Sequence, residues 1–188
     1  MISRAVQLVA RVFLVAGLLA LAYAAYVVID ARVYQTLEHR RFETVQPEPP
    51  VTPAVDGSAI GEIQIERIGL TAMVAQGDSP SVLRRAVGHL SDTALPGEEG
   101  NVVLAGHRDT YFRSLKQVRV GDAITLKTRD GEFAYLVEST AVVPPTDVQV
   151  LEPTGRRTLT LITCFPFSYV GPAPERFIVR ARELEPRR

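Results

Sequence analysis

The chain contains a single cysteine, Cys164, at a position where a reactive side chain is expected. It follows the run Thr158–Thr163, in which threonines alternate with apolar residues as in a strand, and it precedes Phe165-Pro166. Because proline interrupts a strand, Cys164 is expected at the strand's last position, where side chains commonly face a cleft. Most free cysteines are buried and unreactive. The chemical alternative is a thiolate nucleophile that forms a covalent acyl intermediate.

A thiol nucleophile needs a partner that carries protons, and the chain offers three histidines. His107 follows the apolar run Asn101–Ala105 and Gly106, so it is expected at a strand end, like the cysteine. His39 lies next to an apolar N-terminal segment and is expected to be solvated. His89 is expected to be a hydrogen-bonded polar residue near the wall of the fold. His107 is therefore the candidate partner of Cys164.

Acyl transfer also needs a hydrogen-bond donor for the negative charge that develops on the carbonyl oxygen. Arg176 begins the strand-like run after the Cys164 loop, so a hairpin-like return could bring its guanidinium to the thiol. Arg180 and Arg182 share its face by the period of two and are expected to be solvated strand charges. Spacing alone gives only a weak argument for Arg176.

Short strands separated by turn signals dominate the chain after the proline-rich stretch near residue 50. Asp130-Gly131 is a hairpin-turn dipeptide, and Ser79-Pro80 is typical of the start of a short helix. Seven or eight short strands at this spacing predict a mainly β fold, a closed or nearly closed barrel with short helices. The chain lacks the glycine-rich phosphate-binding motifs, which argues against a nucleotide-binding fold. The strand-like runs are Glu62–Ile65, Ile68–Val74, Asn101–Ala105, Asp122–Arg129, Glu132–Val143, Thr158–Thr163 and Arg176–Leu184.

An uncharged apolar run, Val12–Ile29, lies near the N-terminus. A helix needs roughly 20 such residues to cross a bilayer. Arg4 and Arg11 precede the run, which predicts a cytoplasmic N-terminus and an exported remainder. Ala22–Ala24 has the small-x-small form of a signal-peptide cleavage site, so a cleaved signal is the alternative. The run is longer than the usual apolar region of a signal peptide, which favours a retained anchor.

Composition excludes several classes of protein, and the apolar and proline-rich segments divide the chain into three parts. One cysteine excludes a disulfide framework and a cysteine-based zinc site. The 21 basic and 21 acidic side chains balance, which argues against a nucleic-acid partner. We predict an anchor and juxtamembrane helix at residues 1–43, a proline-rich linker at 44–58 and a catalytic domain at 59–188. An exported chain with one unpaired thiol suggests that the thiol is reactive.

Three short motifs together resemble the catalytic positions of the sortases, which are membrane-anchored cysteine transpeptidases. Thr160-Leu161-Ile162-Thr163-Cys164 resembles the family's TLxTC signature. His107 within Leu104–Thr110, and Arg176 within Glu175–Val179, match the family's other two catalytic positions in type and order. The similarity covers about residues 61–181, and its motif regions most resemble class D sortases.

The resemblance implies an eight-stranded sortase-type β-barrel behind an N-terminal transmembrane helix, in a single-pass cell-membrane protein. Cys164 would attack an LPxTG-like sorting signal after its threonine, with His107 as proton carrier and Arg176 as donor to the oxyanion or substrate backbone. Thr163 would help to position the substrate. The expected partners are substrate proteins with C-terminal sorting signals and an amine nucleophile, either a peptidoglycan precursor or a pilin lysine. No metal or cofactor is expected.

Two other functions remain open at this point. An exported hydrolytic cysteine peptidase would share the Cys164 and His107 chemistry but pass the acyl group to water. A non-catalytic β-barrel that binds peptides would need none of the three residues, so the presence of Cys164, His107 and Arg176 together argues against it.

Overall fold

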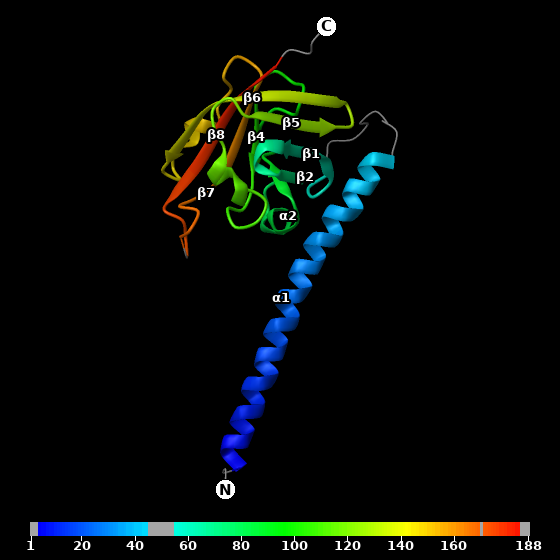
Figure 1. Cartoon of the computed structure of the whole chain (residues 1–188), viewed down its shortest axis with the longest axis vertical. Helices are drawn as coiled ribbons and strands as arrows, with labels where there is room; N and C mark the ends of the chain where they lie inside the picture. The colour runs from blue at the N-terminus through cyan, green and yellow to red at the C-terminus, as the bar shows by residue number, and fades with distance from the viewer. Residues whose placement is uncertain (1–3, 45–54, 170, 185–188) are drawn as a thin grey trace.

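A computed structural model describes residues 4–44, 55–169 and 171–184 of the chain. It consists of a long N-terminal helix, α1, and a β-barrel packed beside the C-terminal half of that helix (Figure 1). Most of the predicted linker at residues 44–58 lies outside the described residues, which resume at Val55.

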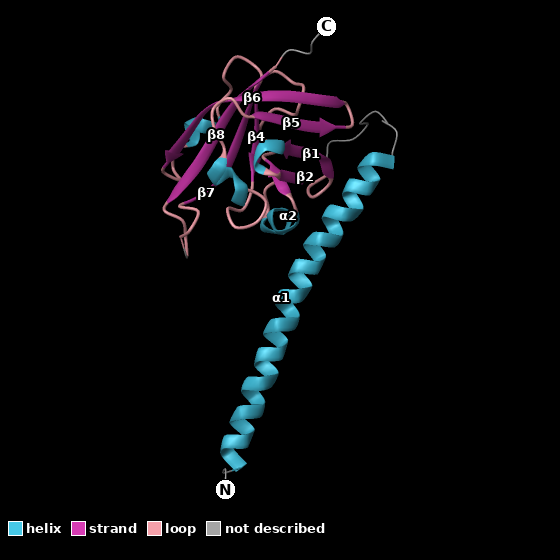
Figure 2. Ribbon diagram, in the orientation of Figure 1, coloured by secondary structure: helices cyan, strands magenta, loops and turns pink. Residues whose placement is uncertain are grey.

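Eight strands form a closed barrel in the order β1-β2-β3-β4-β7-β8-β6-β5, which confirms the predicted mainly β fold. Neighbouring strands are antiparallel except for the parallel pairs β2–β3 and β4–β7. The helices other than α1 are short and lie outside the strands (Figure 2). The strands are β1 Ala59–Ile65, β2 Leu70–Gln76, β3 Val87–His89, β4 Asn101–Ala105, β5 Ala123–Thr128, β6 Gly131–Val143, β7 Thr158–Phe165 and β8 Glu175–Glu183, and the short helices are η1 Glu66–Ile68, α2 Pro80–Arg85, η2 Arg113–Gln117 and η3 Val148–Leu151.

Inward- and outward-facing side chains alternate along the barrel strands, as the sequence pattern predicts. In β7, Leu159 and Leu161 are fully buried in the core, whereas Cys164 on the other face is only partly buried. Phe112 and Tyr135 are the largest fully buried side chains. Because such interiors are densely packed, the strands have fixed positions, and side chains at their ends are held in a fixed geometry.

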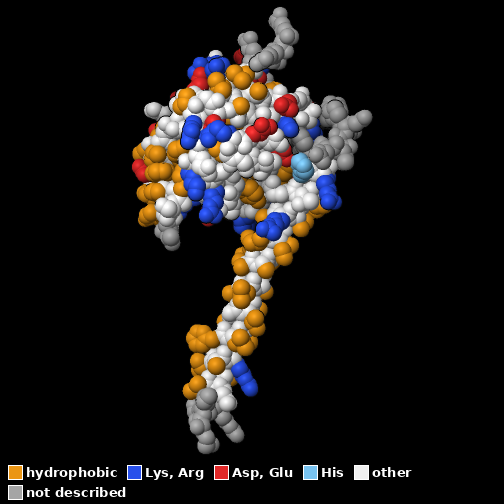
Figure 3. Space-filling model, in the orientation of Figure 1, with side chains coloured by type: hydrophobic (Ala, Val, Ile, Leu, Met, Phe, Trp, Pro, Cys, Tyr) orange, Lys and Arg blue, Asp and Glu red, His pale blue; other side chains and the backbone are white. Residues whose placement is uncertain are grey.

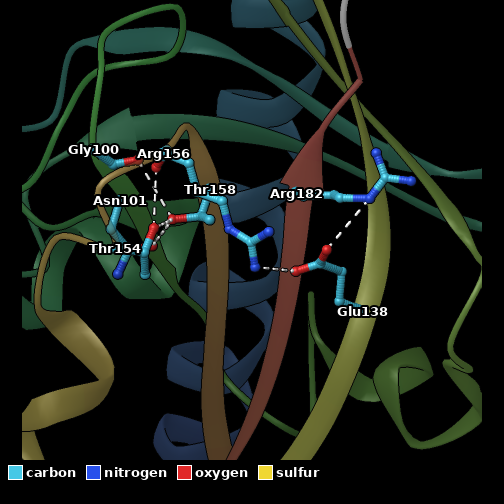
Figure 4. Close-up of polar contacts among 7 residues, drawn as sticks. All are labelled: Gly100, Asn101, Glu138, Thr154, Arg156, Thr158 and Arg182. Atoms are coloured by element: carbon cyan, nitrogen blue, oxygen red, sulfur yellow. Dashed lines mark hydrogen bonds and ion pairs between the residues drawn. The ribbon is translucent and has the colours of Figure 1, made fainter.

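The buried amide of Asn101 helps to hold the β6–β7 connection (residues 144–157) on the outer surface of the barrel. Its Nδ2 donates to loop carbonyls, and its Oδ1 accepts from hydroxyls on β7. Figure 4 shows Asn101 and Thr158 beside Thr154 of the connection, whose hydroxyl lies 3.0 Å from that of Thr158. The side-chain partners of Asn101 are Val150 O (3.1 Å), Leu151 O (3.2 Å), Glu152 O (3.4 Å), Thr158 Oγ1 (3.2 Å) and Thr160 Oγ1 (2.7 Å).

Replacing Asn101 with alanine is expected to destabilise the barrel by about 2–4 kcal/mol, because buried carbonyls and hydroxyls lose their partner. The midpoint temperature of thermal unfolding, measured on the full chain in detergent, should fall by roughly 5–15 °C. Gln149→Ala, an exposed position of the same connection, serves as the control and should leave the midpoint nearly unchanged. Equal midpoints for the two variants would contradict the assigned role of Asn101.

Helix α1 spans Arg4–Thr44 and has two distinct parts. Its N-terminal part extends away from the barrel with its apolar side chains exposed (Figures 1 and 3), and it is long and apolar enough to cross a bilayer. In the second part, Tyr34 packs against a small buried cluster of Ala75, Val82 and Ala86. Its hydroxyl donates to the carbonyl of Gly57 at 3.0 Å, and burial raises the pKa of Tyr34 to about 12.

Polar contacts continue this attachment along α1. The Asp30 carboxylate accepts from Arg85 Nε at 2.6 Å. The Gln35 amide donates to the carbonyl of Arg85 at 2.7 Å and accepts from the backbone N–H of Met73 at 2.9 Å, on β2. His39 was expected to be solvated, and its side chain is 46% exposed. Its Nδ1 also lies 2.6 Å from a carboxylate oxygen of the buried Glu62. We call Asp30, Tyr34, Gln35 and His39 the docking seam.

Candidate active site

Cys164 and Arg176 face each other across the antiparallel pair β7–β8, where they are direct register partners. Directly opposed residues project from the same face of a sheet, so their side chains are neighbours. The Arg176 guanidinium donates to the carbonyls of Ala173 at 3.3 Å and Glu175 at 3.0 Å. These bonds hold it near the start of β8, beside the end of β7.

His107 reaches the same point from β4, which runs parallel to β7. The last register pair is Ala105 with Ile162, and the Gly106 N–H then donates to the carbonyl of Ile162 at 3.1 Å. Continuing this register by two residues brings His107 beside Cys164. The His107 carbonyl accepts from the Phe112 N–H at 3.1 Å, which closes the loop, and the His107 side chain is exposed.

Thr163 is buried, and its hydroxyl donates to the carbonyl of Gly106 at 2.7 Å. Its predicted contact with substrate stays a prediction. The observed bond ties β7 to β4 one residue before each of Cys164 and His107, so it fixes the spacing of the two strand ends. A Cβ on Gly106 would lie 2.7 Å from the ring of Phe112, which explains why glycine occupies this position.

Sequence reasoning missed Arg108, the residue after His107. Its guanidinium donates to the carbonyls of Pro166 at 3.0 Å, Tyr169 at 2.7 Å and Gly171 at 3.0 Å. It also lies 5.8 Å from the centre of the Tyr169 ring. Arg108 thus joins the histidine loop to the β7–β8 connection (described residues 166–169 and 171–174). Its partners are mostly backbone carbonyls, which leave no signal in a sequence.

An aromatic cluster supports the end of β7 next to the thiol. Phe165, Phe167 and Phe177 have ring centres 5.3–6.2 Å apart, within the range of favourable aromatic pairs. Phe167 and Phe177 also pack against the main core. The cluster therefore links the residues that flank Cys164 and Arg176 to the rigid interior of the barrel.

A cavity of about 440 Å³ lies between the β6–β7 connection and the outer faces of β6 and β8. It begins at Ile178, two residues along β8 from Arg176 and on the same face. Arg180, expected to be a solvated charge, instead donates to the carbonyl of Val150 at 3.0 Å and braces the connection. Arg182 pairs with Glu138 at 3.3 Å on the surface (Figure 4). The lining residues are Ser139, Ala141, Asp147, Gln149, Val150, Glu152, Pro153, Thr154, Ile178 and Arg180.

His89 lies outside this site, as a buried residue of β3. Its Nδ1 is 3.0 Å from Gln76 Oε1, and its Nε2 is 2.9 Å from the carbonyl of Ala94, which confirms the expected hydrogen-bonded residue. Burial lowers the pKa of His89 below its usual value, because a buried imidazolium loses hydration.

A pH-dependent loss of stability follows from His89. Near pH 6.5 the unfolded chain binds a proton at His89 more readily than the folded chain does. The stability that neutral His89 contributes to the folded state is therefore present above that pH and is lost as the pH falls below it. In thermal unfolding between pH 7.5 and 5.5, His89→Gln is expected to flatten the pH slope. Gln149→Ala, which removes no titratable group, is expected to keep the slope, and equal slopes for wild type and His89→Gln would contradict the assignment.

Within the three described segments, no group of three or more His, Cys, Asp or Glu side chains is arranged to hold a metal ion. The arrangement that remains is a thiol, an imidazole and a guanidinium at the ends of three neighbouring strands. A thiol and an imidazole on adjacent strand ends have the chemistry for acyl transfer, and a guanidinium can donate to an oxyanion.

Comparison with other sequences gives consistent matches. Residues 63–184 match the family model described as a sortase domain. Sortase D of Bacillus subtilis (strain 168) is 31% identical over 186 residues, which covers 90% of this chain and 94% of the relative. Sortase SrtE1 of Streptomyces coelicolor is 34% identical over 129 residues, covering 58% of this chain and 37% of that protein.

Solved structures show the same similarity. The sortase D5 transpeptidase of Clostridium perfringens is 29% identical, with a TM-score of 0.71, and the match covers 81% of this chain and 97% of that one. The sortase E of Streptomyces avermitilis is 33% identical, with a TM-score of 0.60, and the match covers 70% of this chain and 91% of that one. Since the family match covers more than half of the chain, this protein belongs to the sortase family of cysteine transpeptidases.

Proposed function

We propose that this sortase cleaves an LPxTG-like sorting signal after its threonine and transfers the acyl group to an amine at the cell envelope. The observation that carries the proposal is the register pairing of Cys164 with Arg176, next to the strand end that bears His107. The acceptor amine is a peptidoglycan precursor or a pilin lysine, so the reaction anchors or polymerises surface proteins.

In the first half of the reaction, the Cys164 thiolate forms a C–S bond to the threonine carbonyl, whose electron pair moves to oxygen. Arg176 donates hydrogen bonds to that oxyanion, a contribution of about 3 kcal/mol in a sheltered site. Collapse breaks the C–N bond, and protonated His107 gives its proton to the departing amine. In the second half, neutral His107 takes a proton from the incoming amine, which attacks the thioester and releases the thiolate.

The cavity beneath the β6–β7 connection supports binding of the signal in an extended form. It continues the outward face of β8 that carries Arg176, so residues on the acyl side of the scissile bond can lie along Ile178 and Arg180. The contacts of Asn101 and Arg180 with the connection hold this wall in position. Shape, with little electrostatic steering, is then the basis of recognition.

We also infer a single-pass anchor, with the N-terminus in the cytoplasm and the barrel outside. The uncharged run Val12–Ile29 within α1 and the preceding Arg4 and Arg11 support this orientation. The domain division then keeps the expected bounds: anchor and juxtamembrane helix at residues 1–43, linker at 44–58 and catalytic domain at 59–188.

The test incubates the full chain in detergent with a panel of sorting-signal peptides and amine nucleophiles, followed by mass spectrometry of the products. An amide product after cleavage at threonine supports the proposal. Cleavage without an amide product would favour a hydrolytic cysteine peptidase. Absence of cleavage across the panel, despite peptide binding, would favour a non-catalytic peptide-binding barrel.

A further inference from the structure

We propose that the catalytic end of the barrel rests on the surface of the membrane that α1 crosses, against anionic lipid headgroups. This end consists of the loop His107–Tyr111 and the β7–β8 connection. The inference rests on the proposed membrane anchor and adds to it a fixed orientation of the active site toward the bilayer.

The docking seam sets the height of the barrel above the membrane. Asp30 is the first charged residue after the uncharged run Val12–Ile29, so it marks the level at which α1 leaves the hydrocarbon. Arg85, the last residue of α2, is bonded to Asp30 at 2.6 Å and 3.3 Å. Gln35 holds the carbonyl of the same arginine at 2.7 Å. The C-terminal end of α2 is therefore held at the bilayer boundary.

The histidine loop lies at this same level. The Tyr111 hydroxyl is 3.4 Å from the carbonyl of Arg84, the neighbour of Arg85. Burial raises the pKa of Tyr111, and the nearby Asp30 carboxylate raises it further, which agrees with a position beside the membrane end of the seam. Tyr111 is four residues from His107, so the catalytic loop is close to the headgroup layer.

The rest of the catalytic end also lies on the side of the barrel that faces the membrane-spanning part of α1. In Figure 1 the β7–β8 connection and the loop after β4 form the lower end of the barrel, on the side toward which the N-terminal part of α1 runs. The β5–β6 turn lies at the right-hand side of the barrel, above the C-terminal end of α1. The connection carries Tyr169, which is 47% exposed. Aromatic side chains of this kind favour the membrane–water interface.

Charge favours an anionic surface as the partner. Arg32, just after the membrane boundary, and Arg84, at the end of α2, are exposed. Figure 3 shows Lys and Arg side chains gathered along the lower part of the head, where α1 leaves it. Basic groups near a bilayer are attracted to anionic headgroups within about 10 Å. A substrate protein that emerges from the same bilayer would then meet Cys164 close to the membrane surface.

The absence of tryptophan from the chain permits a clean test. Tyr169→Trp places the only tryptophan on the β7–β8 connection, and Arg129→Trp places it in the exposed β5–β6 turn as the matched control. Each full chain is inserted into phosphatidylglycerol-containing vesicles, with or without brominated acyl chains, and its fluorescence is measured. Brominated lipid is expected to quench the fluorescence of the residue 169 variant at least twofold and to leave that of the residue 129 variant nearly unchanged. Iodide, a quencher dissolved in the water phase, should quench mainly the residue 129 variant.

Ser168→Trp, at an exposed neighbouring position, repeats the measurement should Tyr169→Trp fail to fold. Equal quenching of the connection and turn variants by brominated lipid would overturn the orientation. Failure of the chain to float with the vesicles would overturn both the anchor and the orientation. Because quenching needs no turnover, an inactive panel of peptides would count against the proposed reaction and leave this result unaffected.

Discussion

Cys164→Ala is expected to lower the rate of sorting-signal cleavage by on the order of 10⁴-fold or more, because no other group can form the thioacyl intermediate. The side chain is only partly buried, at the end of β7. Its removal should therefore change the free energy of unfolding by less than about 1 kcal/mol. Product formation is measured by chromatography, and the midpoint of thermal unfolding is measured on the same samples.

The single cysteine makes the covalent chemistry directly observable, since every thiol adduct must lie on Cys164. Wild-type chain mixed with a peptide and no amine should gain the mass of the acyl fragment, whereas Cys164→Ala should gain none. Iodoacetamide should add one group to the wild type and abolish turnover. Cleavage of active peptides by Cys164→Ala at the wild-type rate would show that the nucleophile is elsewhere.

Arg176→Ala is expected to lower kcat by about 10²–10³-fold, corresponding to roughly 3–4 kcal/mol of lost transition-state stabilisation. Arg176→Lys retains the charge but loses the planar fork, so about a tenfold loss is expected. Arg182→Ala is the matched control, because it lies on the same strand and face, at the other end of β8, in a surface pair with Glu138. Its activity should stay within about twofold of wild type.

The kinetic pattern separates two roles for Arg176. A loss confined to kcat indicates an interaction made only in the transition state, whereas a rise in KM alone indicates binding of the substrate backbone. Iodoacetamide labelling of Cys164 in each variant checks that the thiol remains accessible. Equal activity losses for Arg176→Ala and Arg182→Ala would contradict the assignment of the oxyanion donor to Arg176.

Local patterns were sufficient for most of the barrel. The hairpin around Asp130-Gly131 and the alternation in Thr158–Thr163 correspond to β5–β6 and β7, because turn chemistry and side-chain period are local properties. The predicted run Ile68–Val74 began too early, since Gly69 has a positive φ of 62° and ends η1 before β2 starts at Leu70.

Strand β3 could not be predicted from its own residues. Val87–His89 contains only three residues, and one of them is glycine. A Cβ on Gly88 would lie 2.4 Å from the carbonyl of Gly77, so the close approach of that backbone requires glycine at this position. It is held by β2 on one side and by β4 on the other. Tertiary contacts of this kind override weak local propensity.

The candidate site was predictable to the extent that it depends on strand ends. Proline after Cys164 and glycine before His107 marked those ends in the sequence, and the structure brings them to one edge. The docking seam was not predictable, because Asp30 and Arg85 are 55 residues apart. Arg108 was missed for a related reason, since its carbonyl partners lie 58 to 63 residues away.

The parallel pairing of β4 with β7 has a consequence for biosynthesis. Gly106 and Thr163, which join the two strand ends, are 57 residues apart, and β8 must enter between β7 and β6 to close the barrel. Because the chain is synthesised from its N-terminus, the histidine loop is made long before Cys164 and Arg176. Long-range pairings of this kind form late in folding. The three candidate catalytic side chains therefore come together only after nearly the whole chain has been synthesised.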